Sequence, residues 1–158
     1  MSPKAQIYKT AAAEIASVIE GEPSAIARYA TASCILSEHF ETFFWTGFYL
    51  VDAHKDDELV VGPYQGTLGC LRIAFNRGVC GACATQQETI IVADVHAFEG
   101  HIACDSATNS EIVVPVFDDA GKLAAVLDVD STQFDNFDAD DKAGLEVICS
   151  VLLKGARS

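Results

Sequence analysis

The chain has 158 residues, half of them hydrophobic, and a formal net charge of −13 from 23 acidic and 10 basic residues. This composition is typical of a single globular domain, here taken as residues 1–158, and not of a disordered chain. The acidity argues against nucleic acid or an anionic membrane as a partner, because both are bound by basic surfaces. No apolar run approaches the ~20 residues of a membrane span, and the N-terminus lacks the apolar core of a signal peptide, so we expect a cytoplasmic protein.

The first seventy-five residues predict two helices and then three strands. Ser2 and Pro3 form an N-cap followed by a proline at the first helical position, which predicts a helix to about Glu20. Pro23 begins a second segment with helical apolar periodicity, which extends to Phe40. The pattern then changes to aromatic and β-branched runs that are typical of strands. These runs are residues 42–52, 58–64 and 71–75.

The rest of the chain predicts further short elements around one long loop. They are a short helix at residues 78–87 and a strand at residues 88–95. A two-stranded hairpin follows at residues 110–118 and 123–131, and the last element is a helix at residues 138–153 with Asp138 as N-cap. The loop runs from Val95 to Thr108, and loops of that length within a compact domain are often functional. Consecutive strands with helices at both ends predict an α+β domain built on an antiparallel sheet.

The six cysteines fall into two groups. Cys34 and Cys149 lie in apolar helical segments, and we expect both to be small buried hydrophobic side chains. The other four lie between positions 70 and 104: Cys70, Cys80, Cys83 and Cys104. Because structural disulfides are rare in a reducing compartment, metal binding or redox chemistry explains this second group better.

Cys80 and Cys83 form a C-x-x-C motif, which occurs both in zinc sites and in redox pairs. A second closely spaced half-site is absent, and the βαβ context of a thioredoxin-type active site is missing, so the motif alone selects neither function. Gly78 and Gly81 place Cys80 near a helix N-terminus, where the helix dipole favours the thiolate.

Cys104 lies in the long loop, so either it has no special role or the loop serves to present it. His96 and His101 flank this part of the loop, and either imidazole could lower the pKa of the Cys104 thiol. A structural role for the two histidines is equally open. We expect Asp105, next to Cys104, to bond within the loop and not to take part in chemistry.

Several acidic and aromatic residues are expected to share one face of the sheet. Alternation along the last strand places Asp128 and Asp130 on the same face, and Glu111 begins the neighbouring strand. Asp130 could equally cap the turn that follows, and Trp45 and Tyr49 of the first strand could be ordinary core residues. Together, however, carboxylates and aromatic rings indicate a pocket for a small cationic or zwitterionic ligand. Gly47, between the two aromatic residues, would leave room for that ligand against the backbone.

Five motifs closely resemble those of the free methionine-(R)-sulfoxide reductases, a family of GAF-domain enzymes. They are WTGFY, GPYQG, NRGVCG, DVHAFEGHIACDSATNSEIVVPV and LDVDS, and the resemblance covers about residues 10–153. It implies a GAF domain, with a central antiparallel sheet of about six strands and the N- and C-terminal helices packed on one face. GAF domains commonly dimerise through terminal helices, so a homodimer is left open.

The resemblance also implies a role for each candidate residue. Cys104 matches the nucleophile, Cys70 the resolving cysteine, and Cys80 a third cysteine that assists or replaces Cys70 in recycling. Trp45 and Tyr49 match the aromatic wall of the substrate pocket. Glu111, Asp128 and Asp130 match the carboxylates that hold the substrate. Cys83 departs from the pattern, since the family usually has a small residue without a thiol there, which leaves open a side disulfide with Cys80.

The implied reaction is reduction of free methionine-(R)-sulfoxide, a repair of oxidative damage, without a cofactor or metal and with thioredoxin as reductant. The Cys104 thiolate would attack the sulfoxide sulfur, and a protonated carboxyl would supply a proton to its oxygen. The resulting sulfenic acid would condense with another thiol to a disulfide, which a dithiol then reduces. Two alternatives remain: a non-catalytic GAF module that binds a small amine or nucleotide, and a zinc protein.

Overall fold

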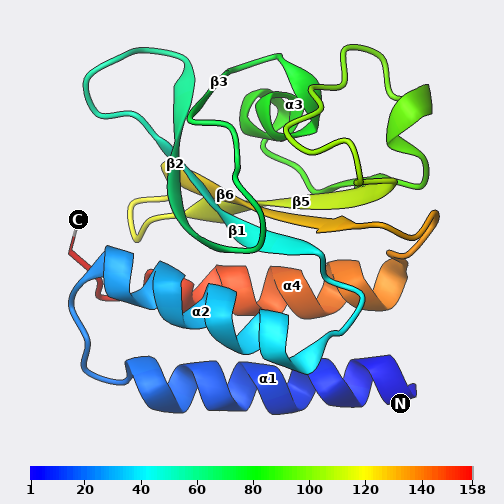
Figure 1. Cartoon of the computed structure of the whole chain (residues 1–158). Coiled ribbons are helices and arrows are strands. Elements are labelled where there is room, and N and C mark those ends of the chain that lie inside the picture. Colours follow the sequence, from blue (N-terminus) through cyan, green and yellow to red (C-terminus); the bar gives the residue numbers. More distant parts are fainter. Residues whose placement is uncertain (158) are drawn as a thin grey trace.

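The computed structural model describes residues 1–157, and its centre is one six-stranded sheet (Figure 1). The strand order is β3-β2-β1-β6-β5-β4, and every neighbouring pair is antiparallel. The strands are β1 (Trp45–Val51), β2 (Glu58–Gln65), β3 (Arg72–Ala74), β4 (Ile90–Val92), β5 (Ser110–Phe117) and β6 (Leu123–Ser131). The predicted α+β fold with six antiparallel strands is therefore confirmed.

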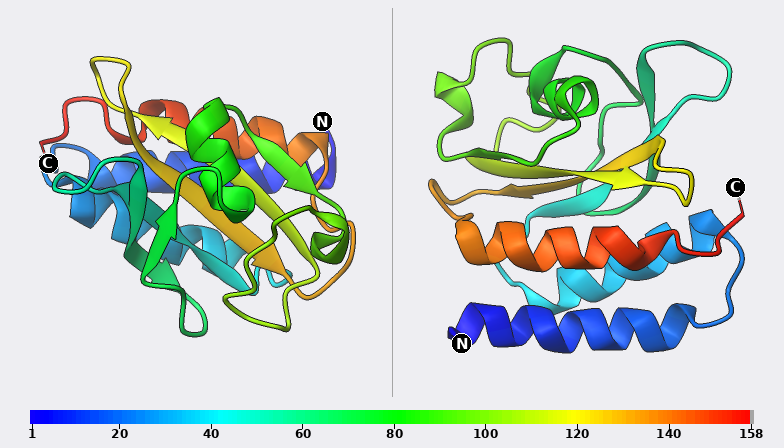
Figure 2. Two further views of the ribbon diagram at one scale, coloured as in Figure 1. Left: turned by 90° about the horizontal axis from the view of Figure 1, so that it is seen from above. Right: turned by 180° about the vertical axis from the view of Figure 1, so that it is seen from behind.

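The helices lie in layers on the two faces of the sheet (Figures 1 and 2). They are α1 (Pro3–Ile19), α2 (Ala25–His39), α3 (Gly78–Gln86) and α4 (Ala139–Leu152), with a short 3₁₀ helix η1 (Val95–Ala97) in the long loop. On one face α2 and α4 contact the strands, and α1 packs mainly on those two helices as an outer layer. On the other face lies α3, which contacts β3, β5 and β6. The expected placement of the terminal helices on one face is confirmed.

Local side chains define where the helices begin. The Ser2 hydroxyl accepts a hydrogen bond from the amide of Ala5, and Pro3 occupies the first helical position. At α4, Asp138 and Asp141 form a capping box, so the predicted N-cap is confirmed. The second helix begins later than predicted, because Ser24 is its N-cap and Pro23 lies outside it.

The two faces of β6 belong to different cores. Ala125, Leu127 and Val129 point to the helical layer and are fully buried. Val126 packs into a second core on the side of α3, and Asp128 lies on that same face. The helical side is thus uniformly apolar, whereas the α3 side mixes apolar and ionisable groups.

Two expectations outside the site can be compared with the structure. Cys149 is buried as predicted, but Cys34 is partly exposed, with its sulfur 3.6 Å from Glu38 Oε1, so the prediction of a buried side chain was wrong there. It lies on α2 beside, and not within, the stripe that faces the core. Among residues 1–157, no helix is both long and apolar enough to cross a membrane.

Candidate active site

A cavity of about 30 Å³ lies on the α3 side of the sheet, where strands β1, β5 and β6 meet α3 and two loops. It brings together most of the residues predicted for the site. Those that line it are Trp45, Tyr49, Cys80, Cys104, Glu111, Asp128 and Asp130. Cys70 does not line the cavity and is bonded to Cys104 at its edge.

The sheet register places the acidic residues side by side on the cavity floor. Glu111 of β5 lies directly opposite Asp130 of β6, and Trp45 of β1 lies opposite the same aspartate on its other side. Two residues earlier on β6, Asp128 lies between Gly47 and Val113. Because side chains two residues apart share a face, the three carboxyl groups converge.

The floor carboxyls have few protein partners. Glu111 and Asp128 are 6% and 5% exposed. Among the described residues, Asp128 Oδ1 and Asp130 Oδ1 are buried without a hydrogen-bond partner. Asp130 therefore does not merely cap a turn, since one of its oxygens is enclosed. A buried carboxylate oxygen in this state is costly unless it is protonated or meets a ligand.

Burial raises the pKa of all three carboxyl groups. For Glu111 the pKa lies well above its usual value, because burial and then the charges of Asp128 and Asp130 disfavour ionisation. Burial and the neighbouring Asp128 charge likewise hold the pKa of Asp130 well above its usual range. Burial also raises the pKa of Asp128, although neighbouring hydrogen-bonding groups oppose this rise. The site therefore retains protons at pH values where exposed carboxyls have lost theirs.

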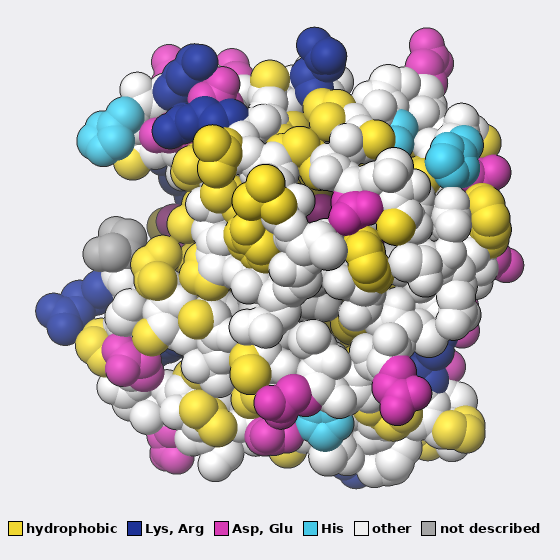
Figure 3. Space-filling model, viewed as in Figure 1, with side chains coloured by type: hydrophobic (Ala, Val, Ile, Leu, Met, Phe, Trp, Pro, Cys, Tyr) yellow, Lys and Arg dark blue, Asp and Glu magenta, His cyan; other side chains and the backbone are white. Residues whose placement is uncertain are grey.

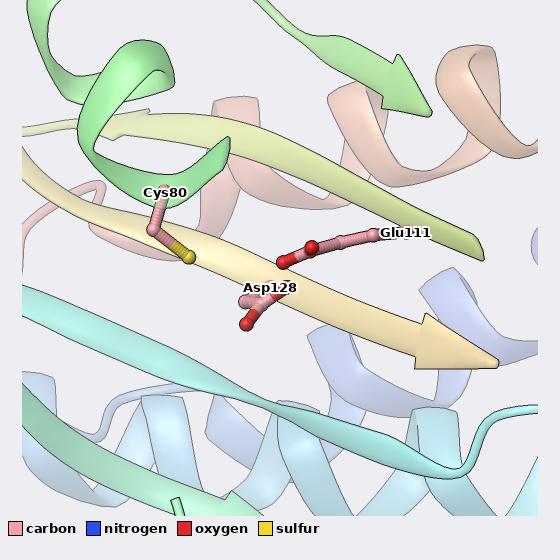
Figure 4. A group of neighbouring side chains, drawn as sticks. All are labelled: Cys80, Glu111 and Asp128. Carbon is pink, nitrogen blue, oxygen red and sulfur yellow. The ribbon is translucent and has the colours of Figure 1, made fainter. Parts of the chain in front are cut away.

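Cys80 points to this floor from the first turn of α3, close to Glu111 and Asp128 (Figure 4). Its thiol is buried, and burial followed by the charges of Asp128 and Glu111 holds its pKa well above the usual value. The predicted preference for thiolate at the helix N-terminus is wrong for this reason: desolvation and nearby carboxyls outweigh the helix dipole.

Cys83 is also a buried free thiol, with burial raising its pKa to about 12. Its sulfur lies 3.7 Å from the carbonyl oxygen of Val113, on the side of the sheet core. With Cys70 and Cys104 in a disulfide, the four-cysteine zinc site considered from the sequence is not assembled here.

The disulfide between Cys70 and Cys104 joins two loops at the cavity edge, with Cα atoms 5.3 Å apart. Cys104 is exposed and Cys70 is partly buried. Beside the bond, the Thr67 hydroxyl donates to Asp105 Oδ2 at 2.6 Å, and Asp105 Oδ1 accepts from the Ala107 amide. The expectation that Asp105 bonds within its loop is confirmed, and it also ties that loop to the segment that carries Cys70.

The aromatic wall of Trp45 and Tyr49 is supported by a third ring that was not predicted, Tyr64 of β2, which does not line the cavity. The Trp45 ring stacks between Tyr49, at 5.6 Å, and Tyr64, at 4.9 Å between ring centroids. Its indole N–H donates to the carbonyl of Thr67 at 2.9 Å and so also holds the Cys70 loop. Gly47 makes room for this wall and not for a ligand, because a Cβ there would collide with Tyr64 and the Trp45 ring. The register of β2 on β1, which the sequence does not show, puts Tyr64 opposite that glycine.

The two histidines of the long loop differ in position. His101 lines the cavity, with its Nε2 3.8 Å from Glu111 Oε1, and burial lowers its pKa. His96 lies at the loop base, where its Nε2 is 3.0 Å from Asn109 Oδ1. The loop packs back on α3 at Gly78, whose positive φ of 61° and contact with Ile102 favour glycine.

Comparisons with known proteins agree with the fold. The GAF domain family matches residues 34–152. "GAF domain-containing protein A" of Dictyostelium discoideum is 44% identical over 94% of this chain and 92% of its own length. The "Free methionine-R-sulfoxide reductase" of Escherichia coli is 40% identical over 96% of this chain and 89% of its own.

A solved structure of an enzyme of the same name as the Escherichia coli relative is also very similar to this chain. It is the free methionine-R-sulfoxide reductase of Neisseria meningitidis in complex with its substrate, at 44% identity and a TM-score of 0.90, covering 96% of this chain and 89% of that one. The chain therefore belongs to the free methionine-R-sulfoxide reductase family, a group of GAF-domain oxidoreductases.

Proposed function

We propose that this protein reduces free methionine-(R)-sulfoxide to methionine, with Cys104 as the nucleophile. The observation that carries the proposal is the position of the Cys70–Cys104 disulfide at the edge of a cavity whose floor retains protons. The named activities of the Escherichia coli and Neisseria meningitidis relatives support the choice of substrate. The same pocket without the disulfide would fit a ligand-binding module equally well.

The proposed reaction proceeds through two oxidised states of Cys104. Its thiolate attacks the sulfoxide sulfur and forms a bond to it, while the oxygen takes up a proton. The hydroxyl group then passes from the methionine sulfur to the Cys104 sulfur as the bond between the two sulfurs breaks, so methionine leaves and Cys104 becomes a sulfenic acid. The Cys70 thiol then displaces water from the sulfenic acid and forms the disulfide. An external dithiol reduces that disulfide, so the net change is sulfoxide plus dithiol to methionine, disulfide and water.

Glu111 is the proposed proton donor. Its pKa lies well above the usual value because of burial and of its neighbours Asp128 and Asp130, so it keeps its proton at pH values where an exposed glutamate has lost it. It also lies beside His101 at the inner end of the Cys104 loop. His101, with a pKa lowered by burial, is neutral and does not compete for that role at neutral pH.

Selectivity for the free amino acid follows from the carboxylates that lack partners. Asp128 and Asp130 each present a buried oxygen without a hydrogen-bond partner among the described residues, and the ammonium group of a free amino acid would supply the missing donors. Trp45 and Tyr49 offer apolar rings to the side chain. A methionine sulfoxide within a polypeptide has no free ammonium group and would leave these oxygens unpaired.

Recycling is assigned to Cys70, with Cys80 as the lesser alternative. Cys80 is buried with a strongly raised pKa, which disfavours its thiolate as an attacking group in disulfide exchange. Around Cys70 the surface is apolar: Leu68 and Leu71 are 79% and 70% exposed, and hydrophobic side chains gather over the β2–β3 connection in Figure 3. A dithiol protein such as thioredoxin would dock there, in a reducing cytoplasm where free methionine needs repair.

The test is turnover of the fully reduced protein with each sulfoxide epimer and dithiothreitol, measured as methionine released. We expect turnover of the R epimer alone, abolished by Cys104→Ser and retained in Cys34→Ser, which removes a cysteine on the opposite side of the sheet. Turnover by Cys104→Ser would refute the nucleophile. No turnover of either epimer, with the thiols still reduced, would favour a non-catalytic ligand-binding domain.

A further inference from the structure

Cys80, Glu111 and Asp128 form a cluster with the composition of a transition-metal site. One possible ligand atom of each lies within 4.8 Å of the others, and all three side chains are buried (Figure 4). In tetrahedral zinc sites, with bonds of about 2.0–2.3 Å, ligand atoms lie about 3.3–3.6 Å apart, so small side-chain rotations would close the cluster on an ion. The residues come from α3, β5 and β6, which are rigid parts of the fold.

A second observation points to a ligand at this place. Asp128 is 5% exposed, and its Oδ1 has no hydrogen-bond partner among residues 1–157. Figure 4 shows its carboxyl group directed toward the same space as the Glu111 carboxyl and the Cys80 sulfur. An enclosed oxygen with an unused lone pair, beside a thiol, is an available metal ligand.

We propose that Cys80, Glu111 and Asp128 bind a divalent ion of the zinc type, and that this ion excludes the sulfoxide from the pocket. The exclusion rests on the proposed function, whereas the metal site itself does not. One thiolate with two carboxylates suits Zn²⁺, while Mg²⁺ and Ca²⁺ prefer six or more oxygen ligands. Three protein ligands leave the fourth tetrahedral position to water.

Binding would be an exchange of the ion for protons. Coordination replaces the protons of the Cys80 thiol and the Glu111 carboxyl and releases them to solvent, without any change in oxidation state. A cavity of about 30 Å³ has room for an ion and a water molecule even while the disulfide is closed. The proposal therefore predicts metal binding in the oxidised protein, where Cys70 and Cys104 are not available.

The experiment uses the oxidised full-length protein and Co²⁺ as a spectroscopic probe. We expect a near-ultraviolet sulfur-to-cobalt charge-transfer band at one equivalent of Co²⁺, removed by Zn²⁺ and unaffected by Mg²⁺. The matched control pair is Cys80→Ser and Cys83→Ser, which change two buried thiols of α3. Cys80→Ser should abolish the band and weaken Zn²⁺ binding by about 100-fold or more, and Cys83→Ser should retain both.

Three outcomes would overturn the metal site: no band in the oxidised wild-type protein, a band retained in Cys80→Ser, or a band lost in Cys83→Ser. If Cys80→Ser does not fold, Glu111→Gln provides the second variant, because it removes a ligand and keeps the side-chain shape. It should weaken Zn²⁺ binding while the cobalt band, which reports the sulfur, remains at higher Co²⁺ concentration.

The exclusion is tested in a Cys70→Ser Cys104→Ser double variant, which cannot react and keeps Cys80 as the pocket thiol. Calorimetry first measures the binding of free methionine-(R)-sulfoxide alone and then the binding of Zn²⁺ with and without it. Mutual exclusion supports the proposal, and simultaneous binding overturns the exclusion. Absence of sulfoxide binding, with Zn²⁺ still bound, would count against the proposed function and leave the metal site intact.

Discussion

Asp141 and Asp128 are almost equally buried, at 1% and 5% exposed, but their surroundings differ. At the start of α4, the Asp141 carboxylate accepts hydrogen bonds from the Tyr8 hydroxyl at 2.6 Å, the Lys4 ammonium at 2.8 Å and the Asp138 amide at 2.8 Å. On the pocket floor, Asp128 has an oxygen that no described residue satisfies. The first carboxylate stabilises the fold, while the second needs a proton or a ligand.

The pKa values of the carboxyl groups beside Asp141 and beside Asp128 are shifted in opposite directions. Beside Asp141, desolvation opposes ionisation of the exposed Asp138, but hydrogen bonds from Lys4 and from the backbone outweigh it and lower the pKa of Asp138. On the pocket floor, burial and like charges raise the pKa of Glu111 and Asp130. Burial alone therefore does not identify a functional carboxylate; burial with missing partners does.

Glu111→Gln should give the largest effect, because the amide cannot donate the catalytic proton but keeps the shape of the floor. We expect kcat for the R sulfoxide to fall by about 10³-fold, within the range of general-acid catalysis. Steady-state kinetics with dithiothreitol measures this loss, with the exposed Glu88→Gln as the matched control. An unchanged kcat would remove Glu111 from the mechanism and turn attention to Asp130.

Asp141→Ala should show the opposite behaviour. Loss of this carboxylate leaves the Tyr8 hydroxyl and the capping-box amide without their acceptor and leaves the Lys4 ammonium only Asp138 and a backbone carbonyl, at a cost of about 3 kcal/mol in the free energy of unfolding. Denaturant unfolding measures this, and Asp56→Ala, at an exposed aspartate, is the control. The activity per folded molecule should stay the same. A stable but inactive variant would contradict the division between the two carboxylates.

Much of the fold followed from local sequence patterns. The caps at Ser2 and Asp138, the aromatic strand at Trp45 and the alternation along β6 depend on near neighbours, and each is confirmed. The convergence of Glu111 with the two aspartates also follows from alternation in a hairpin. These features were predictable because they depend on the alternation of side chains along a strand and on the positions of caps and turns in the sequence.

The errors in prediction at the site come from contacts between residues that are distant in the sequence. Tyr64 fills the space at Gly47 because β2 pairs with β1 in a particular register, which alternation alone does not fix. The thiolate preference predicted for Cys80 failed because Glu111 and Asp128 arrive beside it from β5 and β6. A helix dipole is visible in a sequence, but the carboxyls that overcome it are not.

The variant Asp128→Asn tests the difference between Asp128 and Asp141 through a smaller change in the free energy of unfolding. Because one oxygen of Asp128 lacks a partner while neighbouring groups support its charge only in part, we expect the free energy of unfolding at neutral pH to change by no more than about 1 kcal/mol. The same change at Asp141 should destabilise. Thermal unfolding compares the two asparagine variants directly, and KM for the sulfoxide should rise in Asp128→Asn alone. Equal destabilisation of both variants would mean that Asp128 has partners in solution.

The pH dependence of stability should carry the smallest signal. Because the pKa of Glu111 is raised in the folded protein, that state binds the proton more tightly than the unfolded chain does. The stabilisation is complete below the unfolded pKa of about 4.3 and is lost as the pH rises toward the folded value, with a slope below the ~1.4 kcal/mol per pH unit of one whole proton. The free energy of unfolding of wild type should therefore fall relative to Glu111→Gln as the pH rises from about 5 to 7.

Asp138 has a lowered pKa, so its stabilisation is present above its unfolded pKa and is lost as the pH falls through its folded pKa. Its signal therefore lies in the acidic range, outside this window. A difference between wild type and Glu111→Gln that does not change over this range would mean that the pocket opens to water and that its carboxyls titrate like exposed ones.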